Sequence, residues 1–403
     1  ILGGGFGGIN TYRSLSSWLK EQCEITLIDK NNYFLFTPLL AEVAGGNLDN
    51  HHVVEPLRDI ISKKDTFIKD TIKSINTVEK KVLLSDRELS YDILVNTLGS
   101  ETFFYGIKGA EEYSYVLKSL GDAMVLKNRF VDVMEQASKL PQGKERKQLL
   151  TLMIVGGGPT GVELAGEAAD LFFKTFVDQY PHIDADDIEI LLVNSGPHIL
   201  QMFSHRLQGY AERVLEKDNI RLLKSVTVTE VDADGVVCED GSRIDAGTVV
   251  WTAGVTANAI ECEAGNFEKD RGRIKVNEYL QATKAPETFV IGDVALFPTE
   301  DGRGLPMTAQ IAKQQGVQTA ANIEKLLKGE ELTKFTYNEK GLLASIGSFD
   351  AIAEIKGFHF YGFIAWFMWR TVYLFNFASW GKRFHIMADW TINLFTRRDT
   401  TRL

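Results

Sequence analysis

This 403-residue chain contains only three cysteines, and they are not paired in the sequence. Cys23, Cys238 and Cys262 show neither C-x-x-C nor C-x-x-x-x-C spacing, which argues against a disulfide framework and a redox-active pair. Small buried thiols in a reducing compartment are the simplest interpretation of all three. The sequence pattern also contains nothing that resembles a metal site or a nucleophilic triad.

Long hydrophobic runs are also lacking. No apolar stretch reaches the roughly 18 to 20 residues that a membrane span needs, and the longest, residues 357–369, is stopped by Arg370. The net charge of −10 argues against a general nucleic-acid binder. With 403 residues and 44% hydrophobic content, the chain is long enough for two or three domains with substantial cores.

Two glycine-rich loops are the most informative feature that is present. GGGFGG occupies residues 3–8 and GGGPTG occupies residues 156–161, both in G-x-G-x-x-G register. In such a loop the glycines permit a tight strand-to-helix turn, a close approach to a pyrophosphate, and close packing of helix on strand. One match is weak evidence, but two matches, each followed by a helix and another strand, predict two dinucleotide-binding units.

The two halves repeat each other beyond these loops. Residues 24–29 and 188–194 are expected to form second strands, which end in Asp29 and Asn194. An acid at this point usually accepts hydrogen bonds from the nucleotide ribose. Residues 91–100 and 245–254 form a further pair of buried strands, each ending in a small-residue turn. Two nucleotide units in one chain indicate electron transfer between cofactors.

Periodicity places the remaining elements. We expect a small antiparallel meander over residues 73–84, helices over 119–139 and 308–327, and a buried strand over 288–295. In a doubly wound fold, the last strand and helix return to the first domain. The sequence therefore predicts an α/β protein with a discontinuous first domain (1–115 and 270–335), a second domain (116–269) and a C-terminal region (336–403).

The C-terminal region differs from the rest in charge and in aromatic content. Residues 357–403 carry six Lys or Arg against two acids, so this segment is +4 and the remainder −14. An aromatic stripe on a helix is predicted by the spacing of Trp366, Trp369, Tyr373, Phe377 and Trp380. Aromatic residues beside basic ones suit an amphipathic helix that lies in the membrane surface. A dimer interface is the alternative.

The whole chain resembles the glutathione-reductase-like flavoproteins with two dinucleotide-binding domains. Specifically, it resembles the type II NADH dehydrogenases, which are non-pumping NADH:quinone oxidoreductases. The glycine loops and IGD at residues 291–293 establish only the superfamily. AQIAKQQG at residues 309–316 and ADWTINLFTRRD at residues 388–399 are much more specific.

The resemblance implies non-covalent FAD in the first domain and NADH or NADPH in the second. Asp29 would contact the adenosine ribose and Asp293 the ribityl chain, although Asp293 could simply cap a turn. Residues 36–40 would run beside the isoalloxazine. At the flavin we expect Gly3, Gly5, Phe6, Gly7, Gly8, Asp29, Lys30, Thr37, Pro38, Thr97, Gly99, Asp293 and Gln310. At the nicotinamide nucleotide we expect Gly156, Gly158, Pro159, Thr160, Gly161, Glu163, Asn194, Ala253 and Gly254.

Four residues are expected to act in catalysis: Glu163, Gln310, Gln314 and Arg370. By the resemblance, Glu163 approaches the flavin and the nicotinamide or quinone, and quinone reduction needs protons as well as electrons. The glutamines, at i and i+4 on a helix, would bind quinone carbonyls, and Arg370 would border the quinone tunnel. The alternatives are an acid favoured at a helix N-terminus, a polar helix face and an interfacial arginine.

The implied function is hydride transfer from NADH to FAD, followed by transfer of two electrons to a membrane quinone in a respiratory chain. The protein would be a homodimer, peripheral on the cytoplasmic-side face of a cell membrane or on an organellar inner membrane. A sulfide:quinone reductase and a nucleotide-gated interaction flavoprotein that resembles apoptosis-inducing factor are the alternatives. The first needs paired cysteines near the flavin, and none occurs after Cys262.

Asn194 departs from the family pattern, because NADH-specific members commonly carry an acid there. A carboxylate accepts from both ribose hydroxyls and repels the 2′-phosphate of NADPH. Asparagine removes that repulsion, so the sequence predicts relaxed discrimination between NADH and NADPH. His198, His205 and Arg206 are candidate phosphate ligands by sequence proximity alone.

Overall fold

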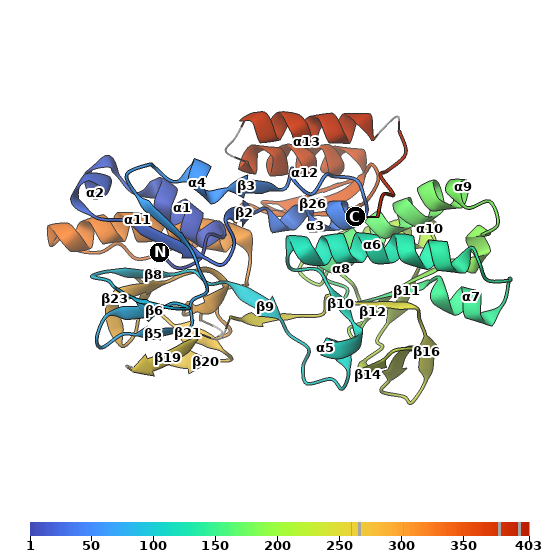
Figure 1. Ribbon diagram of the computed structural model, residues 1–403, viewed down its shortest axis with the longest axis horizontal. Coiled ribbons are helices and arrows are strands. Elements are labelled where there is room, and N and C mark those ends of the chain that lie inside the picture. The colour runs from blue at the N-terminus through green and yellow to red at the C-terminus, as the bar shows by residue number, and fades with distance from the viewer. Residues whose placement is uncertain (259, 265–266, 301, 378–379, 394–395, 403) are drawn as a thin grey trace. The chain divides into compact units, whose positions relative to one another are not determined.

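The computed structural model describes the chain apart from residues 259, 265–266, 301, 378–379, 394–395 and 403, and describes only the backbone of residues 261–264. Phe395 of the C-terminal motif and the Cys262 side chain therefore lie outside the described part. The chain divides into two compact units, drawn in Figure 1. Unit 1 comprises Ile1–Leu35, Val54–Glu101 and Val255–Asn338, and unit 2 comprises Phe36–Val53, Thr102–Gly254 and Glu339–Leu403.

This division differs from the predicted domain boundaries. Residues 36–53 group with the second unit, because the short helix α3 (Leu40–Ala44) packs on α6 (Leu120–Ala137) and α8 (Pro159–Ala169). The C-terminal segment 339–403 also groups with unit 2 rather than forming a region apart. Local sequence signals mark elements, whereas the boundary of a unit depends on which distant segments pack together.

A mostly parallel sheet forms the core of unit 1. Leu2 bridges in parallel to both Ile28 and Asn96, so the start of the chain occupies the middle of this sheet. Strand β1 (Thr26–Asp29) pairs with β4 (Thr66–Lys69), and β8 (Leu94–Asn96) pairs with β23 (Ala285–Val290), all in parallel. Strands β1, β8 and β23 confirm the strands predicted at residues 24–29, 91–100 and 288–295.

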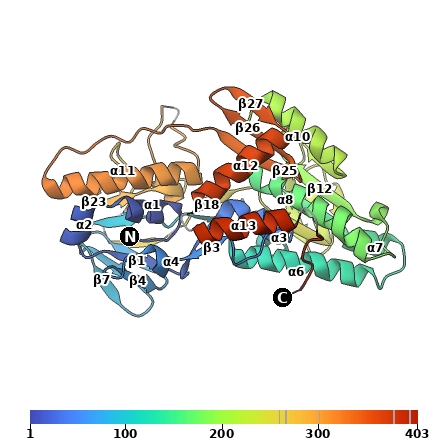
Figure 2. The same cartoon turned by 90° about the horizontal axis from the view of Figure 1, so that it is seen from above.

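Helices α1 (Phe6–Ser14) and α11 (Ala309–Lys328) lie side by side in unit 1 (Figure 2). Thr308 begins α11 by accepting a hydrogen bond from the Ile311 N–H, and Gly329 ends it in a left-handed conformation. The predicted helix at residues 308–327 is confirmed. The other elements of unit 1 are α2 (Ser17–Gln22), β2 (Tyr33–Leu35), β3 (Val54–Pro56), α4 (Leu57–Ile60), β5 (Ser74–Asn76), β6 (Lys81–Leu83), β7 (Glu88–Ser90), β9 (Ser100–Thr102, which begins in this unit), β18 (Val255–Ala257), β19 (Glu261–Ala264), β20 (Lys269–Asp270), β21 (Arg273–Lys275), β22 (Gln281–Ala282), the 3-10 turn η4 (Gly292–Val294) and β24 (Ala295–Leu296). Strands β5 and β6 are antiparallel, as predicted for residues 73–84, and β7 extends this meander beyond the predicted range.

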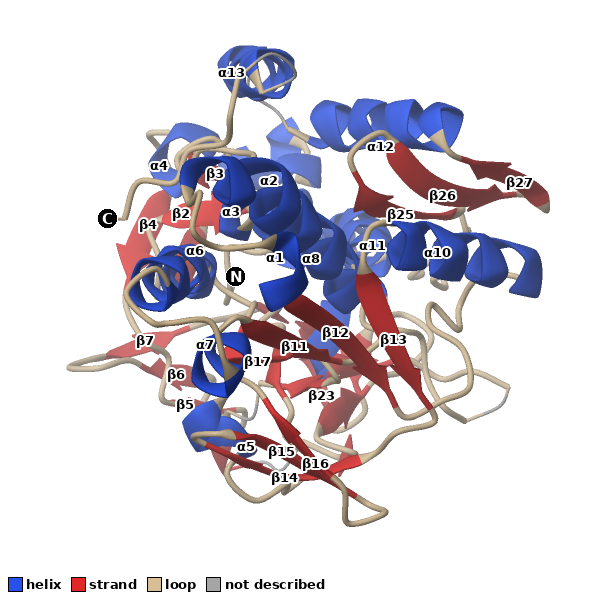
Figure 3. Cartoon of the chain, turned by 90° about the vertical axis from the view of Figure 1, so that its right-hand side faces the viewer, coloured by secondary structure: helices blue, strands red, loops and turns tan. Residues whose placement is uncertain are grey.

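Unit 2 is built on a five-stranded parallel sheet in the order β10-β17-β11-β12-β13. Strands β17, β11, β12 and β13 can be followed in Figure 3. The strands are β10 (Tyr115–Val116), β17 (Thr248–Trp251), β11 (Thr151–Val155), β12 (Glu189–Asn194) and β13 (Ile220–Lys224). Strand β11 is buried along its whole length, as expected for a central parallel strand. Helix α6 begins with a capping box formed by Ser119 and Asp122, and it confirms the helix predicted at residues 119–139.

A second, antiparallel sheet in unit 2 is formed by β25 (Leu342–Gly347), β26 (Asp350–Ile355) and β27 (Phe358–Tyr361). It lies between α10 (His205–Lys217) and α12 (Phe363–Asn376) in Figure 3. The remaining elements of unit 2 are η1 (Thr37–Leu39), α5 (Ala110–Tyr113), α7 (Lys144–Leu149), the π-helical segment η2 (Asp170–Phe176), α9 (Val177–Gln179), η3 (Ala185–Asp187), β14 (Val228–Asp232), β15 (Gly235–Cys238), β16 (Arg243–Asp245) and α13 (Trp380–Ile392).

The predicted aromatic stripe is wrong as a single lipid-facing surface. It is divided between α12 and α13, and Trp366, Trp369 and Phe377 are buried because they pack within unit 2. The exposed apolar side chains of the two helices belong to other positions. They are Phe363, Ile364, Phe367, Val372, Phe375, Trp380, Phe384, Met387 and Ile392, each 41–75% exposed. Among the described residues, no helix combines the length and the apolar character that crossing a membrane requires.

Candidate functional site

The two glycine loops share a close contact between helix and loop. In unit 1, a Cβ added at Gly8 would lie 1.9 Å from the carbonyl oxygen of Gly3. In unit 2, a Cβ added at Gly161 would lie 1.9 Å from the carbonyl oxygen of Gly156. Any side chain at Gly8 or Gly161 would therefore push the helix away from its loop.

A threonine ties each loop to the strand that returns beside it. The Thr97 hydroxyl lies 2.9 and 3.0 Å from the carbonyl oxygens of residues 2 and 3. The Thr252 hydroxyl lies 3.0 and 3.2 Å from those of residues 155 and 156. The duplication inferred from the sequence is therefore also a duplication of contacts.

Each loop opens onto space at the start of a helix. Gly5 and Gly158 are the N-cap residues of α1 and α8, and a Cβ added at either would meet no atom within 4 Å. Because glycine supplies no side-chain oxygen, these caps leave the first N–H groups of each helix facing outward, which suits a phosphate group. Phe6, Pro159 and Thr160 begin the two helices beside this space.

Asp29 and Asn194 end the second strand of each unit, as the sequence predicts. The Asp29 carboxylate accepts hydrogen bonds from the N–H groups of Gly4 and Asn31, both at 2.6 Å. Burial is the main cause that raises the pKa of Asp29, and these two hydrogen bonds oppose it. The neighbouring Lys30 is exposed and lowers the pKa of Asp29 by its charge.

The Asn194 amide is held in a different way. Its oxygen lies 3.3 Å from the N–H of Gly157, while its NH₂ group donates to the carbonyls of Gly196 and His198 at 3.0 and 2.9 Å. Both amide hydrogens are therefore directed to backbone atoms. Only the amide oxygen of Asn194 is therefore left to contact a bound nucleotide.

Asp293 lies in the turn after β23 and accepts a hydrogen bond from the Ser100 hydroxyl. The turn itself is held by Gln315, which is 1% exposed and whose side-chain oxygen accepts from the Gly292 N–H at 2.7 Å. Ser100 and Gln315 were not among the predicted site residues. Gly99, which was predicted, precedes Ser100 and accepts from the Asn258 N–H at 3.0 Å.

The two glutamines of α11 have protein partners in unit 1. The Gln314 amide makes two hydrogen bonds with the backbone of Asn338, at 2.9 and 3.0 Å. The Gln310 oxygen accepts from the Tyr337 hydroxyl at 2.6 Å. Gln314 thus holds the segment that follows α11, a contact that helical spacing does not reveal.

The other predicted nucleotide-site residues of unit 2 lie on its loops. Ala253 and Gly254 follow β17, and a Cβ at Gly254 would lie 2.4 Å from the Tyr105 hydroxyl oxygen. Thr37 and Pro38, which the sequence predicts beside the flavin, group with unit 2 instead and form the 3-10 turn η1, which leads into α3. The preceding Phe36 is buried against the Phe377 ring, with 4.6 Å between the centroids.

Glu163 is a buried carboxyl group on α8, immediately after the second loop. Its Oε1 accepts from the Ser345 N–H at 3.3 Å, and the residue is 9% exposed. Desolvation by burial raises the pKa of Glu163 to about 8, and the negative charges of Glu42 and Glu167 add to this effect. Glu163 is therefore protonated near neutral pH, unlike an ordinary acid at the start of a helix.

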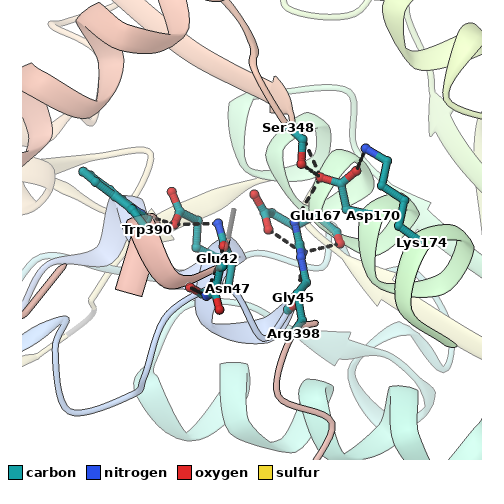
Figure 4. Close-up of polar contacts among 10 residues, drawn as sticks. Glu42, Gly45, Asn47, Glu167, Asp170, Lys174, Ser348, Trp390 and Arg398 are labelled. Carbon is teal, nitrogen blue, oxygen red and sulfur yellow. Dashed lines mark hydrogen bonds and ion pairs between the residues drawn. The ribbon is translucent and has the colours of Figure 1, made fainter. Parts of the chain in front are cut away.

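The sequence prediction missed three further buried acids of unit 2: Glu42 on α3, Glu167 on α8 and Asp170 at the start of η2 (Figure 4). Glu42 accepts from the Trp390 indole N–H at 2.7 Å and from the Asn47 amide at 3.0 Å. Burial raises the pKa of both Glu42 and Glu167. Glu163, Glu167 and Asp170 stand at i, i+4 and i+7 on an apolar helix, which is the signal that could have found them.

Arg370, on α12, interacts electrostatically with Glu42 and Glu167. Its guanidinium carbon lies 3.9 Å from the Trp366 ring centre and 4.5 Å from that of Trp390. Burial lowers the pKa of Arg370, whereas Glu42 and Glu167 raise it. Its Nε is buried and has no hydrogen-bond acceptor among the described residues, so this donor is available to an added group.

Comparison with known proteins identifies the family. A family model described as pyridine nucleotide-disulphide oxidoreductase matches residues 1–316, and one described as NDH2 C-terminal domain matches residues 340–399. A Mycobacterium tuberculosis protein named type II NADH:quinone oxidoreductase Ndh is 30% identical, and the alignment covers 99% of this chain and 88% of that protein. A probable NADH dehydrogenase of Dictyostelium discoideum is 33% identical, with 99% and 90% coverage.

Solved structures share the fold. The structure of NDH2 from Plasmodium falciparum in complex with NADH superposes with a TM-score of 0.92 at 22% identity and covers 99% of this chain and 98% of that one. A sulfide:quinone oxidoreductase of Aquifex aeolicus has the same architecture, with a TM-score of 0.75, 18% identity, and 98% and 94% coverage. The family resemblance seen in the motifs is confirmed. The chain belongs to the pyridine nucleotide-disulphide oxidoreductase family and, within it, to the type II NADH:quinone oxidoreductases.

Proposed function

We propose that this chain oxidises NADH and reduces a membrane quinone through a bound flavin, without pumping protons. The observation that carries the proposal is the combination of two matching dinucleotide loops with one buried, protonated carboxyl group, Glu163. The reaction requires a hydride donor, a redox cofactor and a source of protons. The loop of unit 2 can bind the hydride donor, the loop of unit 1 can bind the redox cofactor, and Glu163 can supply a proton.

The flavin is FAD, bound non-covalently to the loop of unit 1. The open space at Gly5 and the start of α1 suit its pyrophosphate, and the Asp29 carboxylate suits its adenosine ribose. Asp293, positioned by Gln315 and Ser100, is available for the ribityl hydroxyls. When bound, the flavin accepts a hydride from the nicotinamide and passes two electrons to the quinone.

NADH binds the loop of unit 2. Gly158 and the start of α8 suit the pyrophosphate, and the Asn194 oxygen suits a ribose hydroxyl. NADPH also fits this loop, because no carboxylate at position 194 repels its 2′-phosphate.

Glu163 provides a proton for quinone reduction from its Oε atoms. Because its pKa is raised to about 8, the carboxyl group holds a proton at neutral pH and can release it to a developing quinol anion. Arg370 offers its unpaired Nε–H to a quinone carbonyl. Gln314 acts indirectly, since its amide holds the backbone of Asn338.

The exposed apolar side chains of α12 and α13 contact the membrane surface, where the quinone is dissolved. Lys382 and Arg383 of α13 add positive charge for anionic headgroups. We assign the protein to the cytoplasmic-side face of a cell membrane or to an organellar inner membrane. A homodimer uses the edge strand β27, where Phe358 and Tyr361 are 70% and 44% exposed.

Separate measurement of the two half-reactions tests this function. NADH should reduce the enzyme-bound flavin rapidly without oxygen, and a soluble quinone should then reoxidise it. Acid precipitation should release FAD from the protein. A flavin that NADH reduces but that no quinone reoxidises would leave the chain as an NADH-binding interaction protein and overturn the proposal.

A further inference from the structure

Arg398, close to the end of the chain, makes four hydrogen bonds within unit 2 (Figure 4). Its Nη1 lies 2.7 Å from the Glu167 carboxylate and 3.0 Å from the carbonyl oxygens of Gly45 and Glu167. Its Nη2 lies 3.0 Å from the Asp170 carboxylate. The side chain is only 10% exposed, so these are buried charge-assisted contacts rather than surface ion pairs.

Two glycines make room for the end of the chain. A Cβ added at Gly45 would lie 3.0 Å from the Arg398 guanidinium and 2.8 Å from the Glu167 Cβ. A Cβ at Gly46 would lie 2.8 Å from the carbonyl oxygen of Asp399, and Gly46 has a φ of +70°. The turn after α3 is therefore shaped to accept the C-terminal segment.

The two acids that Arg398 binds continue the row that begins at Glu163. Glu167 lies one turn further along α8, and Asp170 begins the π-helical segment that follows. Asp170 also accepts from the Ser348 N–H at 3.1 Å and pairs with Lys174. Interruptions of this kind in a helix occur often at functional sites.

We propose that Arg398 is a positioning residue for the reaction: by binding Glu167 and Asp170, it fixes the row of carboxyl groups on α8 and η2 and the charge that Glu163 faces. This inference rests on the proposed function, in which Glu163 supplies a proton. The C-terminal segment is then part of the chemical site, in addition to any role at the membrane. Other titratable groups that interact with this row are Glu42, Lys174, Asp218, Arg370 and Tyr373.

The electrostatic consequence has a definite sign. Arg398 lowers the pKa of Glu167, and so favours its charged form. The charge on Glu167 in turn raises the pKa of Glu163. Loss of the guanidinium should therefore favour the protonated form of Glu167. Because neutral Glu167 no longer repels the Glu163 carboxylate, the pKa of Glu163 should fall.

The test compares Arg398→Gln with Arg398→Lys and with the matched control Arg397→Gln. Arg397 is adjacent but 62% exposed, and its partner is the exposed Asp178. Infrared titration of the flavin-loaded enzyme counts protonated carboxyl groups, and stopped-flow measures flavin reoxidation by a soluble quinone against pH. Arg398→Gln should carry one additional protonated carboxyl at neutral pH, and its reoxidation midpoint should move about one pH unit toward acid. Flavin reduction by NADH should be unchanged.

Arg398→Lys should restore the carboxyl titration at least in part, because it returns the charge. Glu167→Gln should reproduce the acid shift of the midpoint without the additional carboxyl, which keeps the inference testable if Arg398→Gln does not fold. Identical titrations in Arg398→Gln and Arg397→Gln, or an unmoved midpoint in Glu167→Gln, would overturn it. If the wild type reduces no quinone, the proposed function fails, while the infrared comparison still decides the role of Arg398.

Discussion

Asp29 and Asn194 occupy equivalent positions in the two nucleotide units, and each accepts the N–H of the second glycine of its loop. The distances are 2.6 Å from the Gly4 nitrogen and 3.3 Å from the Gly157 nitrogen. The two side chains differ in charge and in hydrogen-bond donors, because asparagine is neutral and carries an NH₂ group. Asp29 is a carboxylate, whereas the Asn194 NH₂ is committed to two backbone carbonyls.

Donor specificity follows from this comparison. We expect the wild type to use NADH and to accept NADPH at a comparable kcat/KM, because no charge at position 194 opposes the 2′-phosphate. Asn194→Asp should lower kcat/KM for NADPH by about tenfold relative to NADH, equivalent to about 1.4 kcal/mol. The Arg206 guanidinium carbon lies 5.7 Å from the centre of the Tyr361 ring. Because this contact already engages its side chain, Arg206 is a poor candidate for binding the 2′-phosphate. Strict NADH selectivity of the wild type would show that another group reads the ribose.

Substitutions in the two loops should separate the two nucleotides. Gly8→Ala should abolish flavin binding, because its Cβ would meet the Gly3 carbonyl oxygen at 1.9 Å. Gly161→Ala should leave flavin bound but raise KM for NADH at least tenfold, by the same contact in unit 2. Flavin content and steady-state kinetics measure both. Gly209→Ala is the control, since the nearest atom to its Cβ, in the Arg213 side chain, lies 3.7 Å away. Loss of flavin from Gly161→Ala instead would contradict the assignment of the loops.

Glu163→Gln should slow flavin reoxidation by quinone and spare flavin reduction by NADH. Since the pKa of Glu163 is about 8, the wild-type reoxidation rate should fall as pH rises through that value. The variant should lose this dependence, because an amide does not titrate. An unchanged pH profile in the variant would show that Glu163 has only a structural role.

The same group should affect stability with a defined sign. The folded protein binds the Glu163 proton more tightly than the unfolded chain, so its contribution is fully present below the unfolded pKa of 4.5 and is lost as pH rises through about 8. Glu163→Gln should therefore gain stability relative to the wild type as pH increases from about 4.5 to about 8, and the difference should stay constant at higher pH. Thermal unfolding of both proteins at several pH values measures the difference.

Membrane contact and dimer contact should respond to different phenylalanines. Phe367→Glu and Phe384→Glu place a charge on exposed positions of α12 and α13, which are 62% and 66% exposed, and should reduce sedimentation with anionic liposomes. Phe358→Glu, on β27, changes an equally exposed phenylalanine and should weaken the dimer while leaving liposome binding intact. Retained liposome binding in both helix variants would refute the membrane surface. We do not expect deletion of the C-terminal segment to be equally informative, because Trp366, Trp369 and Trp390 are buried in unit 2.

Several site residues could be predicted from the sequence because they belong to short contiguous motifs. The glycines of both loops, Asp29 and Asn194 depend on local backbone geometry, and their contacts agree between the two units. Gln315 was missed because Gln314 has the same side chain and the motif alone does not tell which one faces Gly292. The helix that carries both residues was predicted, but its rotation relative to the rest of unit 1 was not.

The sequence by itself determined the two nucleotide units and their order of strands and helices, because these follow from glycine spacing and hydrophobic periodicity over a few residues. The family followed from the resemblance of two short motifs, at residues 309–316 and 388–399. Only the tertiary structure decided which acids share one buried space. Glu42, Glu167 and Arg398 lie far apart in the chain, and their meeting depends on how α3, α8 and the C-terminal segment pack. Burial also decided the protonation of Glu163, since the pKa of a carboxyl group depends on the water and charges around it rather than on its neighbours in sequence.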